Sequence, residues 1–487
     1  MQLLATLISI DSQTVQPVYL QIANGLIELI KEGTLPASQR LLSTRKMAGL
    51  LKVHRKTVVR AYDELLAQGW LKSKGGSGTY VSEDLPEVKP KKFASKTTND
   101  QGLKTAGFEI GTADHLTRKI IRPLSKYHLD DGYPDVRIAP LNDLARAYSN
   151  QLKVGNKYLR LGYGDTKGSL WLREELCNYF RDTRGLNITV ENILITRGTI
   201  MCLFLVSNAL LTPGDNVAMG QLGWMSAYMN FIQAKANVIK IPTDSYGIVV
   251  DELRKVCLSR KIRLVYVTPH HNYPTTVALR ADRRMQLINL AKEFGFIIFE
   301  DDYDYDFHYL NKPLQPLIGA DKNGHVLYCG SFTKTIAPGF RVGYLVGPEN
   351  VIERLAMLRR IVDRQGDNML ENAIAELLQF GIIQKHLRKS VRIYRERRDY
   401  FCNLMNDKLT NKVSFHVPEG GMAAWTTFDS SIKLADLAAK AAKRDIYINN
   451  CSGQLQNQNE GNSVRLGFAS SDLAELEYMI ETINILI

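Results

Sequence analysis

Long hydrophobic runs and paired cysteines are both missing from this 487-residue chain. No apolar stretch approaches the roughly 20 residues of a membrane-spanning helix, so the sequence predicts no membrane span. The six cysteines are scattered without a C-x-x-C pair, which argues against a disulfide framework or zinc site and favours a reducing compartment. The N-terminus lacks the basic leader and small-residue cleavage site of a secretory signal. These absences predict a cytoplasmic protein without a metal site.

Acidic residues are scarce toward the N-terminus. Residues 1–82 hold 10 Lys and Arg against 5 Asp and Glu, in a chain whose net charge is +12. Such a basic segment favours a polyanionic partner, and a nucleic acid more than a membrane. A basic surface that only keeps the protein in solution would give the same count. Hydrophobic residues at 45% and charged residues at 23% are ordinary for globular domains.

Three regions differ in composition. Residues 1–82 show helical patterning, and residues 83–126 are rich in Lys, Pro, Thr and Asn, which is typical of a linker. Residues 127–487 alternate short β-rich runs with amphipathic helices. The pattern predicts an α/β domain with a largely parallel sheet.

The N-terminal region has a four-part pattern. Helical spacing over residues 18–32 is followed by a short helix after Ser43, a basic helix over residues 55–68, and two short strands within residues 70–81. Together they predict a winged helix-turn-helix, in which the first half of the basic helix faces the DNA major groove. Arg55, Lys56 and Arg60 lie in that half, outside the apolar stripe.

The segment LLSTRKMAGLLKVHRKTVVRAYDELLAQGWLKSKGGSGTYV resembles the GntR family of bacterial regulators. Two departures are Leu42, where the family usually has Pro, and His54, where it usually has Ser. The resemblance implies DNA binding, and the candidate contact residues are Arg45, Arg55, Lys56, Thr57, Arg60, Lys74, Gly76 and Gly78.

The strongest chemical signal is the segment HVLYCGSFTKTIAPGFRVGY, residues 325–344. An apolar strand runs into Lys334, the natural nucleophile for a Schiff base with an aldehyde. Ser331, Thr333 and Arg341 offer hydroxyls and a guanidinium to a phosphate. An exposed loop lysine beside a structural arginine would explain a bare S-x-T-K match, but the full segment favours covalent binding of pyridoxal 5'-phosphate (PLP).

A second strand delivers carboxylates at its end, in FGFIIFEDDYDYDF, residues 294–307. Glu300, Asp301 and Asp302 precede Tyr303. PLP needs one carboxylate against its pyridine nitrogen and gains from a Tyr hydroxyl on its phenolic oxygen. Carboxylates at a strand end could also bind a metal ion or simply be solvated. The nearby segment with Lys334 is what favours PLP.

A third strand ends before Asn272, whose amide could donate to the same phenolic oxygen. His270 and His271 could suggest a metal pair, but adjacent residues of an extended strand point to opposite faces.

A fourth segment opens an apolar helix at Gly198 and Thr199, and a helix N-terminus is a ready phosphate site. Further on, Trp224 could stack on a cofactor ring, although a core tryptophan is the plain alternative.

Residues 127–487 resemble a fold-type I, class I/II PLP aminotransferase domain, in EDDYDYDF, GSFTKTIAPGFRVGY and VRLGFA. With the N-terminal module, and with LDDGYPD and LGYGDTKGSLWLREEL, the chain resembles the MocR subgroup of GntR regulators over nearly its full length. The resemblance implies an α/β fold with a mostly parallel central sheet and a smaller C-terminal α+β subdomain.

The resemblance also assigns roles. Lys334 would form the internal aldimine, Asp301 would meet the pyridine nitrogen, and Tyr303 would meet the phenolic oxygen. Arg465 would clamp the carboxylate of a substrate-like effector. The phosphate would be held by Gly198, Thr199, Ser331, Thr333, Arg341 and, across a homodimer, Tyr163 of the partner subunit.

One departure concerns the turn after the third strand. Related domains usually read P-T-G where this chain has Pro274, Thr275 and Thr276, and Asn272 stands one residue further from the proline than in ordinary aminotransferases.

These patterns lead to a PLP-dependent, homodimeric transcriptional regulator that binds promoter half-sites. It would sense PLP or an amino-group effector through aldimine exchange at Lys334. The alternative is a working aminotransferase that carries a DNA-binding module, which a metabolic aminotransferase does not need. A DNA-binding protein with a degenerate large domain is disfavoured by the intact segment around Lys334.

Overall fold

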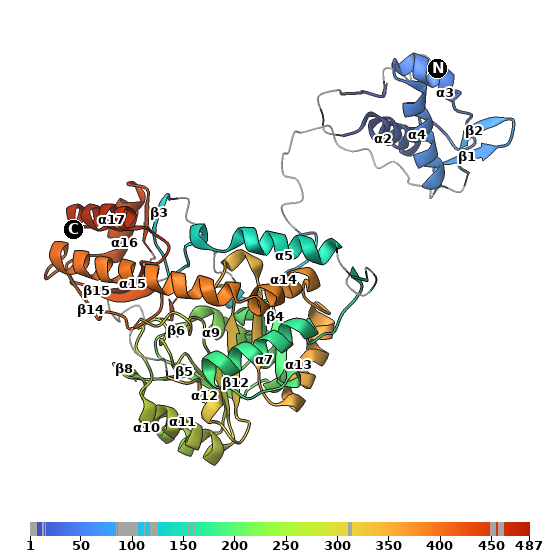
Figure 1. The fold of residues 1–487 in the computed structure, drawn as a ribbon. Helices are drawn as coiled ribbons and strands as arrows, with labels where there is room; N and C mark the ends of the chain where they lie inside the picture. The colour runs from blue at the N-terminus through green and yellow to red at the C-terminus, as the bar shows by residue number, and fades with distance from the viewer. Residues whose placement is uncertain are drawn as a thin grey trace. The chain divides into compact units, whose positions relative to one another are not determined.

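The computed structural model divides the chain into two compact units, Met1–Gly111 and Thr112–Ile487 (Figure 1). Most of the predicted linker, 83–126, lies outside the described residues, so its bounds stay a prediction. The structure describes residues 7–11, 14, 16–83, 85, 106–111, 113–116, 125–153, 155, 156, 158, 161–309, 314–448, 454–455 and 462–487.

The first unit has helices followed by a hairpin, as predicted. Ser43 begins the second helix by accepting a hydrogen bond from the Lys46 backbone N–H at 3.4 Å. His54 begins the third, its Nδ1 accepting from the Lys56 N–H at 3.2 Å, so this departure from the family pattern still caps the helix. The elements are α2 (Val18–Lys31), α3 (Thr44–Leu51), α4 (Arg55–Ala67), β1 (Leu71–Lys74) and β2 (Gly78–Val81).

The second unit is built on a seven-stranded sheet with the order β4-β13-β12-β11-β10-β5-β7. Strand β13 pairs antiparallel with both of its neighbours, and the other neighbouring strands pair in parallel. The mostly parallel sheet predicted from the sequence is confirmed. Its strands are β4 (Ile193–Thr196), β5 (Asn216–Gly220), β7 (Asn237–Ile241), β10 (Ile262–Val267), β11 (Ile297–Asp301), β12 (Val326–Ser331) and β13 (Gly343–Val346).

Helices cover both faces of this sheet because neighbouring residues of its strands alternate between two cores. Leu264 and Phe299 pack with residues of α8 (Thr199–Leu210), α9 (Met225–Gln233) and α13 (Glu349–Val362). Val265 and Ile298 pack on the other face with α10 (Val250–Ser259) and α11 (Ala281–Phe294). The remaining helices before the C-terminal region are α5 (Leu141–Lys153), α7 (Leu170–Arg184), α12 (Leu317–Ala320) and α14 (Asn368–Gln379).

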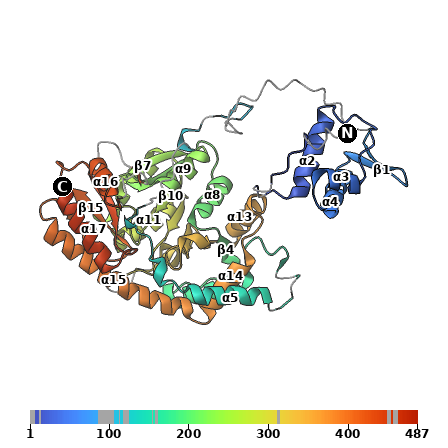
Figure 2. The ribbon, with the colours of Figure 1, turned by 90° about the horizontal axis from the view of Figure 1, so that it is seen from above.

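A smaller α+β region follows, as predicted. Its antiparallel sheet has the order β14-β15-β18, and Figure 2 shows β15, α16 and α17 at one end of the unit, away from α8 and α13. Strand β3 (Tyr127–Leu129), from the start of the unit, pairs in parallel with β16 (Ile446–Ile448). The other elements are α15 (Ile382–Lys408), β14 (Val413–Phe415), β15 (Ala423–Phe428), α16 (Leu434–Ala442), β18 (Ser463–Gly467) and α17 (Leu473–Leu486).

Short pieces complete the fold. The two-residue strands β17 and β6 pair with each other, as do β8 and β9. In the part of the chain that the structure describes, no helix is both long and apolar enough to cross a membrane. The short strands are β6 (Gly223–Trp224), β8 (Thr243–Asp244), β9 (Gly247–Ile248) and β17 (Gln454–Leu455), and the 3-10 turns are Asp114–Leu116, Val136–Ile138, Val190–Asn192 and Pro338–Phe340.

Candidate cofactor site

A cleft of about 780 Å³, counting space open to solvent, lies where parallel strands of the main sheet end. This is the usual place for a ligand in such sheets. Nine residues predicted from the sequence line it: Thr199, Trp224, Asp301, Tyr303, Ser331, Thr333, Lys334, Arg341 and Arg465. Five other lining residues were not predicted: Asp131, Tyr133, Ile200, Tyr266 and Tyr273.

Lys334 follows the end of β12 and reaches into the cleft. Its Nζ donates a hydrogen bond to the Gly132 carbonyl and lies 4.9 Å from the centre of the Tyr133 ring. Burial lowers the pKa of the Lys334 amine below its usual value, although the nearby Asp131 carboxylate acts in the opposite direction. A lowered pKa increases the share of neutral amine, which is the nucleophilic form.

Asp301 ends β11 as a buried carboxylate on the cleft side. The Tyr266 hydroxyl donates to its Oδ2 at 2.7 Å, while Oδ1 is buried without a hydrogen-bond partner among the described residues. Burial raises the pKa of Asp301 to about 7. An unpartnered buried oxygen that faces a cleft fits a protonated ring nitrogen, which would donate to it.

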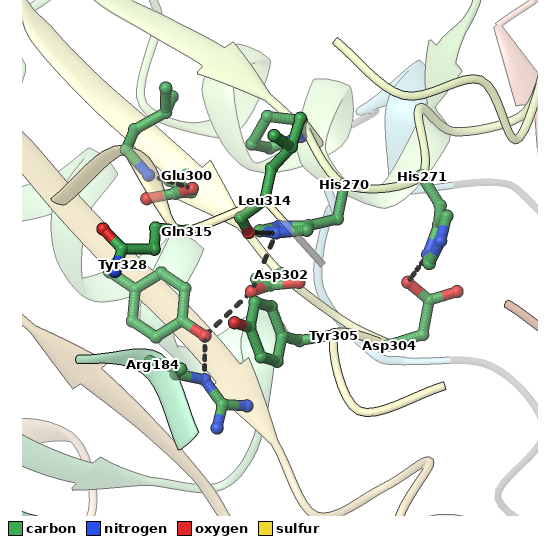
Figure 3. Close-up of polar contacts among 12 residues, drawn as sticks. Arg184, His270, His271, Glu300, Asp302, Asp304, Tyr305, Leu314, Gln315 and Tyr328 are labelled. Carbon is green, nitrogen blue, oxygen red and sulfur yellow. Dashed lines mark hydrogen bonds and ion pairs between the residues drawn. The ribbon is translucent and has the colours of Figure 1, made fainter. Parts of the chain in front are cut away.

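The carboxylates on either side of Asp301 are used structurally. Glu300 accepts hydrogen bonds from the backbone N–H groups of Leu317, at 2.7 Å, and Ile318, at 3.1 Å, which begin α12. Asp302 Oδ2 accepts from the hydroxyl of Tyr328 at 2.8 Å (Figure 3). Residue chemistry alone did not separate the roles of these three acids, whereas the family resemblance assigned the pyridine nitrogen to Asp301.

The two histidines of the third segment do not form a metal pair. The His270 ring meets the Leu314 carbonyl, and Asp302 lies 3.5 Å from its Nδ1. His271 Nδ1 pairs instead with Asp304 at 2.7 Å, and both histidines follow the end of β10 (Figure 3). Among the described residues, no group of three or more His, Cys, Asp or Glu side chains is placed to hold a metal ion.

A polar cradle lies where α8 begins. Thr199 is the first residue of this helix, and Gly198 caps it with a φ of 84°. A side chain at Gly198 would place its Cβ 2.8 Å from Arg341 Nη2, so the close approach of the guanidinium requires glycine here. Ser331 and Arg341 line the same cleft, so helix N–H groups, hydroxyls and a guanidinium converge as a phosphate requires.

Arg465 lies on β18 and is buried, but it is not free. Its Nε lies 3.0 Å from Asp131 Oδ1, and its Nη1 donates to the Pro274 carbonyl at 3.1 Å. The hydroxyl of Tyr273 donates to Asp131 Oδ2 at 2.8 Å. Sequence reasoning missed Asp131, although the matching motif LDDGYPD contains it, because its spacing shows no link to an arginine 334 residues away.

Tyr303 and Asn272, the two residues predicted to contact the phenolic oxygen of the cofactor ring, lie in different pockets. The Tyr303 hydroxyl lines the cleft and donates to the His271 carbonyl at 2.9 Å. Asn272 lines a small neighbouring pocket instead, and its Nδ2 donates to Thr275 Oγ1 at 2.9 Å. Thr276, in the position usually held by glycine, adopts a left-handed φ of 65°. The structure therefore does not bring Asn272 into the cleft.

Tyr163 also lies outside the cleft. Its side chain is 76% exposed, and the Arg364 guanidinium lies 3.7 Å from its ring centre. Exposure leaves it available to a second copy of the chain, as its predicted role requires, and that role stays a prediction.

The predicted DNA contacts lie on the surface of the first unit. Thr57 is half-buried, and Arg60 places its guanidinium 4.0 Å from the Tyr19 ring centre. Glycine allows the φ values of 71° at Gly76, in the turn between β1 and β2, and of 126° at Gly78, where β2 begins. The exposed members are Arg45, Arg55, Lys56, Arg60, Lys74, Gly76 and Gly78.

Two family matches agree with the two units. Residues 18–81 match "Bacterial regulatory proteins, gntR family", and residues 133–483 match "Aminotransferase class I and II". The HTH-type transcriptional regulator YdfD of Bacillus subtilis (strain 168) is 30% identical, over 97% of this chain and 96% of its own. The probable rhizopine catabolism regulatory protein MocR of Rhizobium meliloti is 28% identical, over 95% and 92%.

Solved structures resemble the second unit. The kynurenine aminotransferase of Pyrococcus horikoshii, solved in complex with PMP, superposes with a TM-score of 0.69 at 27% identity. The match covers 74% of this chain and 91% of that one.

Fold and site together define a DNA-binding regulator whose large domain is an aminotransferase-like, cofactor-binding one. The chain belongs to the aminotransferase class I and II family and, with its GntR-type N-terminal unit, to the MocR-like transcriptional regulators. Family membership confirms PLP as the cofactor expected from the sequence.

Proposed function

We propose that this regulator binds PLP covalently through Lys334 and that its affinity for DNA changes when PLP or an amino-group effector occupies the cleft. One observation carries the proposal. In a chain with a GntR-type unit, the amine of the half-buried Lys334, the unpartnered Asp301 Oδ1 and the cradle at Gly198 line or adjoin one cleft.

Each residue would act through a stated group. Lys334 Nζ would provide the amine, Asp301 Oδ1 would accept from the pyridine nitrogen, and the Tyr303 hydroxyl would donate to the phenolic oxygen of the ring. Thr199, Ser331, Thr333 and Arg341 would hold the phosphate at the start of α8, with Gly198. When bound, PLP supplies an aldehyde carbon at which a primary amine can exchange with Lys334.

The first unit would read paired half-sites through the exposed start of α4, with Arg55 and Lys56 against phosphates or base edges. Pairing requires a homodimer, which the exposed side chains of Leu161 and Tyr163 support. The effector must bind one dimer arrangement more tightly than another to change DNA affinity. Access to DNA places the protein in the cytoplasm as part of this proposal.

The test has one arm for each unit. PLP-loaded protein is reduced with sodium borohydride and mapped by mass spectrometry, and the cofactor mass should lie on Lys334. Lys334→Ala should lose the near-ultraviolet cofactor absorption, while Arg55→Ala should keep it and bind promoter DNA about tenfold more weakly, as loss of a contact worth 1–3 kcal/mol implies. A cofactor adduct on another lysine would overturn the cofactor part. Unchanged DNA affinity in Arg55→Ala would overturn the DNA part.

A working aminotransferase is the second candidate, because Lys334, Asp301, Tyr303 and Arg465 all line one cleft. Incubation with an amino donor and a 2-oxo acid separates the two functions. An enzyme would release the new amino acid over many turnovers, whereas a sensor would show the spectral change without sustained product.

A further inference from the structure

An internal carboxylate already occupies the arginine that aminotransferase-like domains offer to a substrate. Asp131 Oδ1 lies 3.0 Å from Arg465 Nε, and the Arg465 side chain is only 2% exposed. The Asp131 side chain is 25% exposed, and both residues line the cleft.

Neighbouring groups hold Asp131 in this place. The Tyr273 hydroxyl fixes Oδ2 at 2.8 Å. The Arg465 guanidinium is 5.0 Å from the centre of the Tyr273 ring, and its Nη1 donates to the Pro274 carbonyl. The arginine is thus paired, stacked and hydrogen-bonded by the chain itself.

A ligand carboxylate could pair with Arg465 Nε only by displacing Asp131. The displaced Asp131 carboxylate would then lie in a partly buried cleft without Arg465 as its partner. It would also lie beside the ligand carboxylate, which carries the same charge. Both effects oppose binding, because an unpaired charge removed from water is costly and like charges repel. A ligand without a carboxylate meets neither cost, and a second ammonium group would gain from Asp131.

We propose that Asp131 makes the cleft select primary amines that lack a carboxylate next to the amine, and that it rejects α-amino acids. This inference rests on the proposed function, since it names the class of effector that would act at Lys334. Asp131 acts as a specificity-determining residue, and Tyr273 positions it.

The experiment compares matched ligands that differ only in the carboxylate. PLP-loaded full-length protein is titrated with L-phenylalanine and 2-phenylethylamine, and with L-lysine and 1,5-diaminopentane, while the cofactor absorption is recorded. In the wild type, each amine should reach half-saturation at a concentration at least about tenfold lower than its amino acid, a difference of about 1.4 kcal/mol.

Asp131→Asn should lower this preference at least about tenfold or reverse it. The comparison between proteins removes the intrinsic reactivity of each amine, which is the same in both titrations. Asp251→Asn is the matched control, because it makes the same change of charge at an exposed position on α10 and should keep the wild-type preference.

A second readout does not depend on the cofactor. The carboxylate 3-phenylpropionate has no amine, and it should raise the melting temperature of cofactor-free Asp131→Asn but not that of the wild type. An equal response of both proteins would overturn the inference.

A wild type that takes amino acids as readily as amines would also overturn the inference, even if Asp131→Asn does not fold. Failure of the proposed function looks different. Protein that binds no PLP shows no absorption to titrate, while the 3-phenylpropionate arm still reports on Asp131.

Discussion

Replacing Asp301 with asparagine should affect the cofactor-free and the PLP-loaded protein in opposite directions. In the cofactor-free protein, burial raises the pKa of Asp301 from 3.8 to about 7. The folded chain then holds this proton more tightly than the unfolded chain, so ionisation destabilises the fold as the pH rises. Asp301→Asn removes that charge and leaves an oxygen to accept from Tyr266.

The size follows from the shift of about three pKa units. At pH 8 the ionisation of Asp301 lowers the free energy of unfolding by roughly 4 kcal/mol. Less than half of this destabilisation is already present at pH 5. Relative to the wild type, Asp301→Asn should therefore gain about 3 kcal/mol between pH 5 and pH 8. For a unit of this size that corresponds to about 4 °C in melting temperature.

The assay is a set of melting curves of both proteins, without PLP, at pH 5 and pH 8. Comparing the two pH values cancels the penalty of the new amide, because that penalty does not depend on pH. PLP affinity should meanwhile fall at least about tenfold, since the pyridine nitrogen loses its charged partner. A difference in melting temperature that stays constant with pH, or PLP affinity equal to that of the wild type, would refute the assignment.

Two further substitutions test the interior. Tyr328→Phe should destabilise the second unit by about 2–4 kcal/mol in denaturant unfolding, because the Tyr328 hydroxyl joins Arg184 Nε at 2.7 Å to Asp302 at 2.8 Å and both would lose a buried partner; an unchanged midpoint would contradict this. Gly420→Ala should lower the melting temperature by several degrees, because the new Cβ would come within 2.2 Å of His271 Nε2. Gly339→Ala, with open space around its Cβ, is the control.

Local signals in the sequence predicted most of the fold. Ser43 and the apolar stripes located the helices of the first unit, because caps and helical spacing act within a few residues. Each predicted chemical segment follows a strand, and parallel strands end at one edge of a sheet, so Lys334 and Asp301 could be expected together.

Contacts between distant segments were not predictable in this way. The pairing of β3 with β16 and the pair of Asp131 with Arg465 join residues more than 300 positions apart. Neither the period of hydrophobic residues nor the local secondary-structure propensity indicates which distant residue a given residue will contact. Asn272 shows the limit of motif transfer, because its place one residue further from the proline goes with a hydrogen bond to Thr275 instead of a place in the cleft.

The three consecutive acids at the end of β11 have a consequence for comparing sequences. Glu300 accepts hydrogen bonds from the start of α12, Asp301 faces the cleft, and Asp302 accepts a hydrogen bond from Tyr328. Neighbouring columns of an alignment therefore contain acidic residues with different roles. An alignment displaced by one column would still find an acid in every place. Only the side on which each residue of the strand lies reveals which of them meets a ligand.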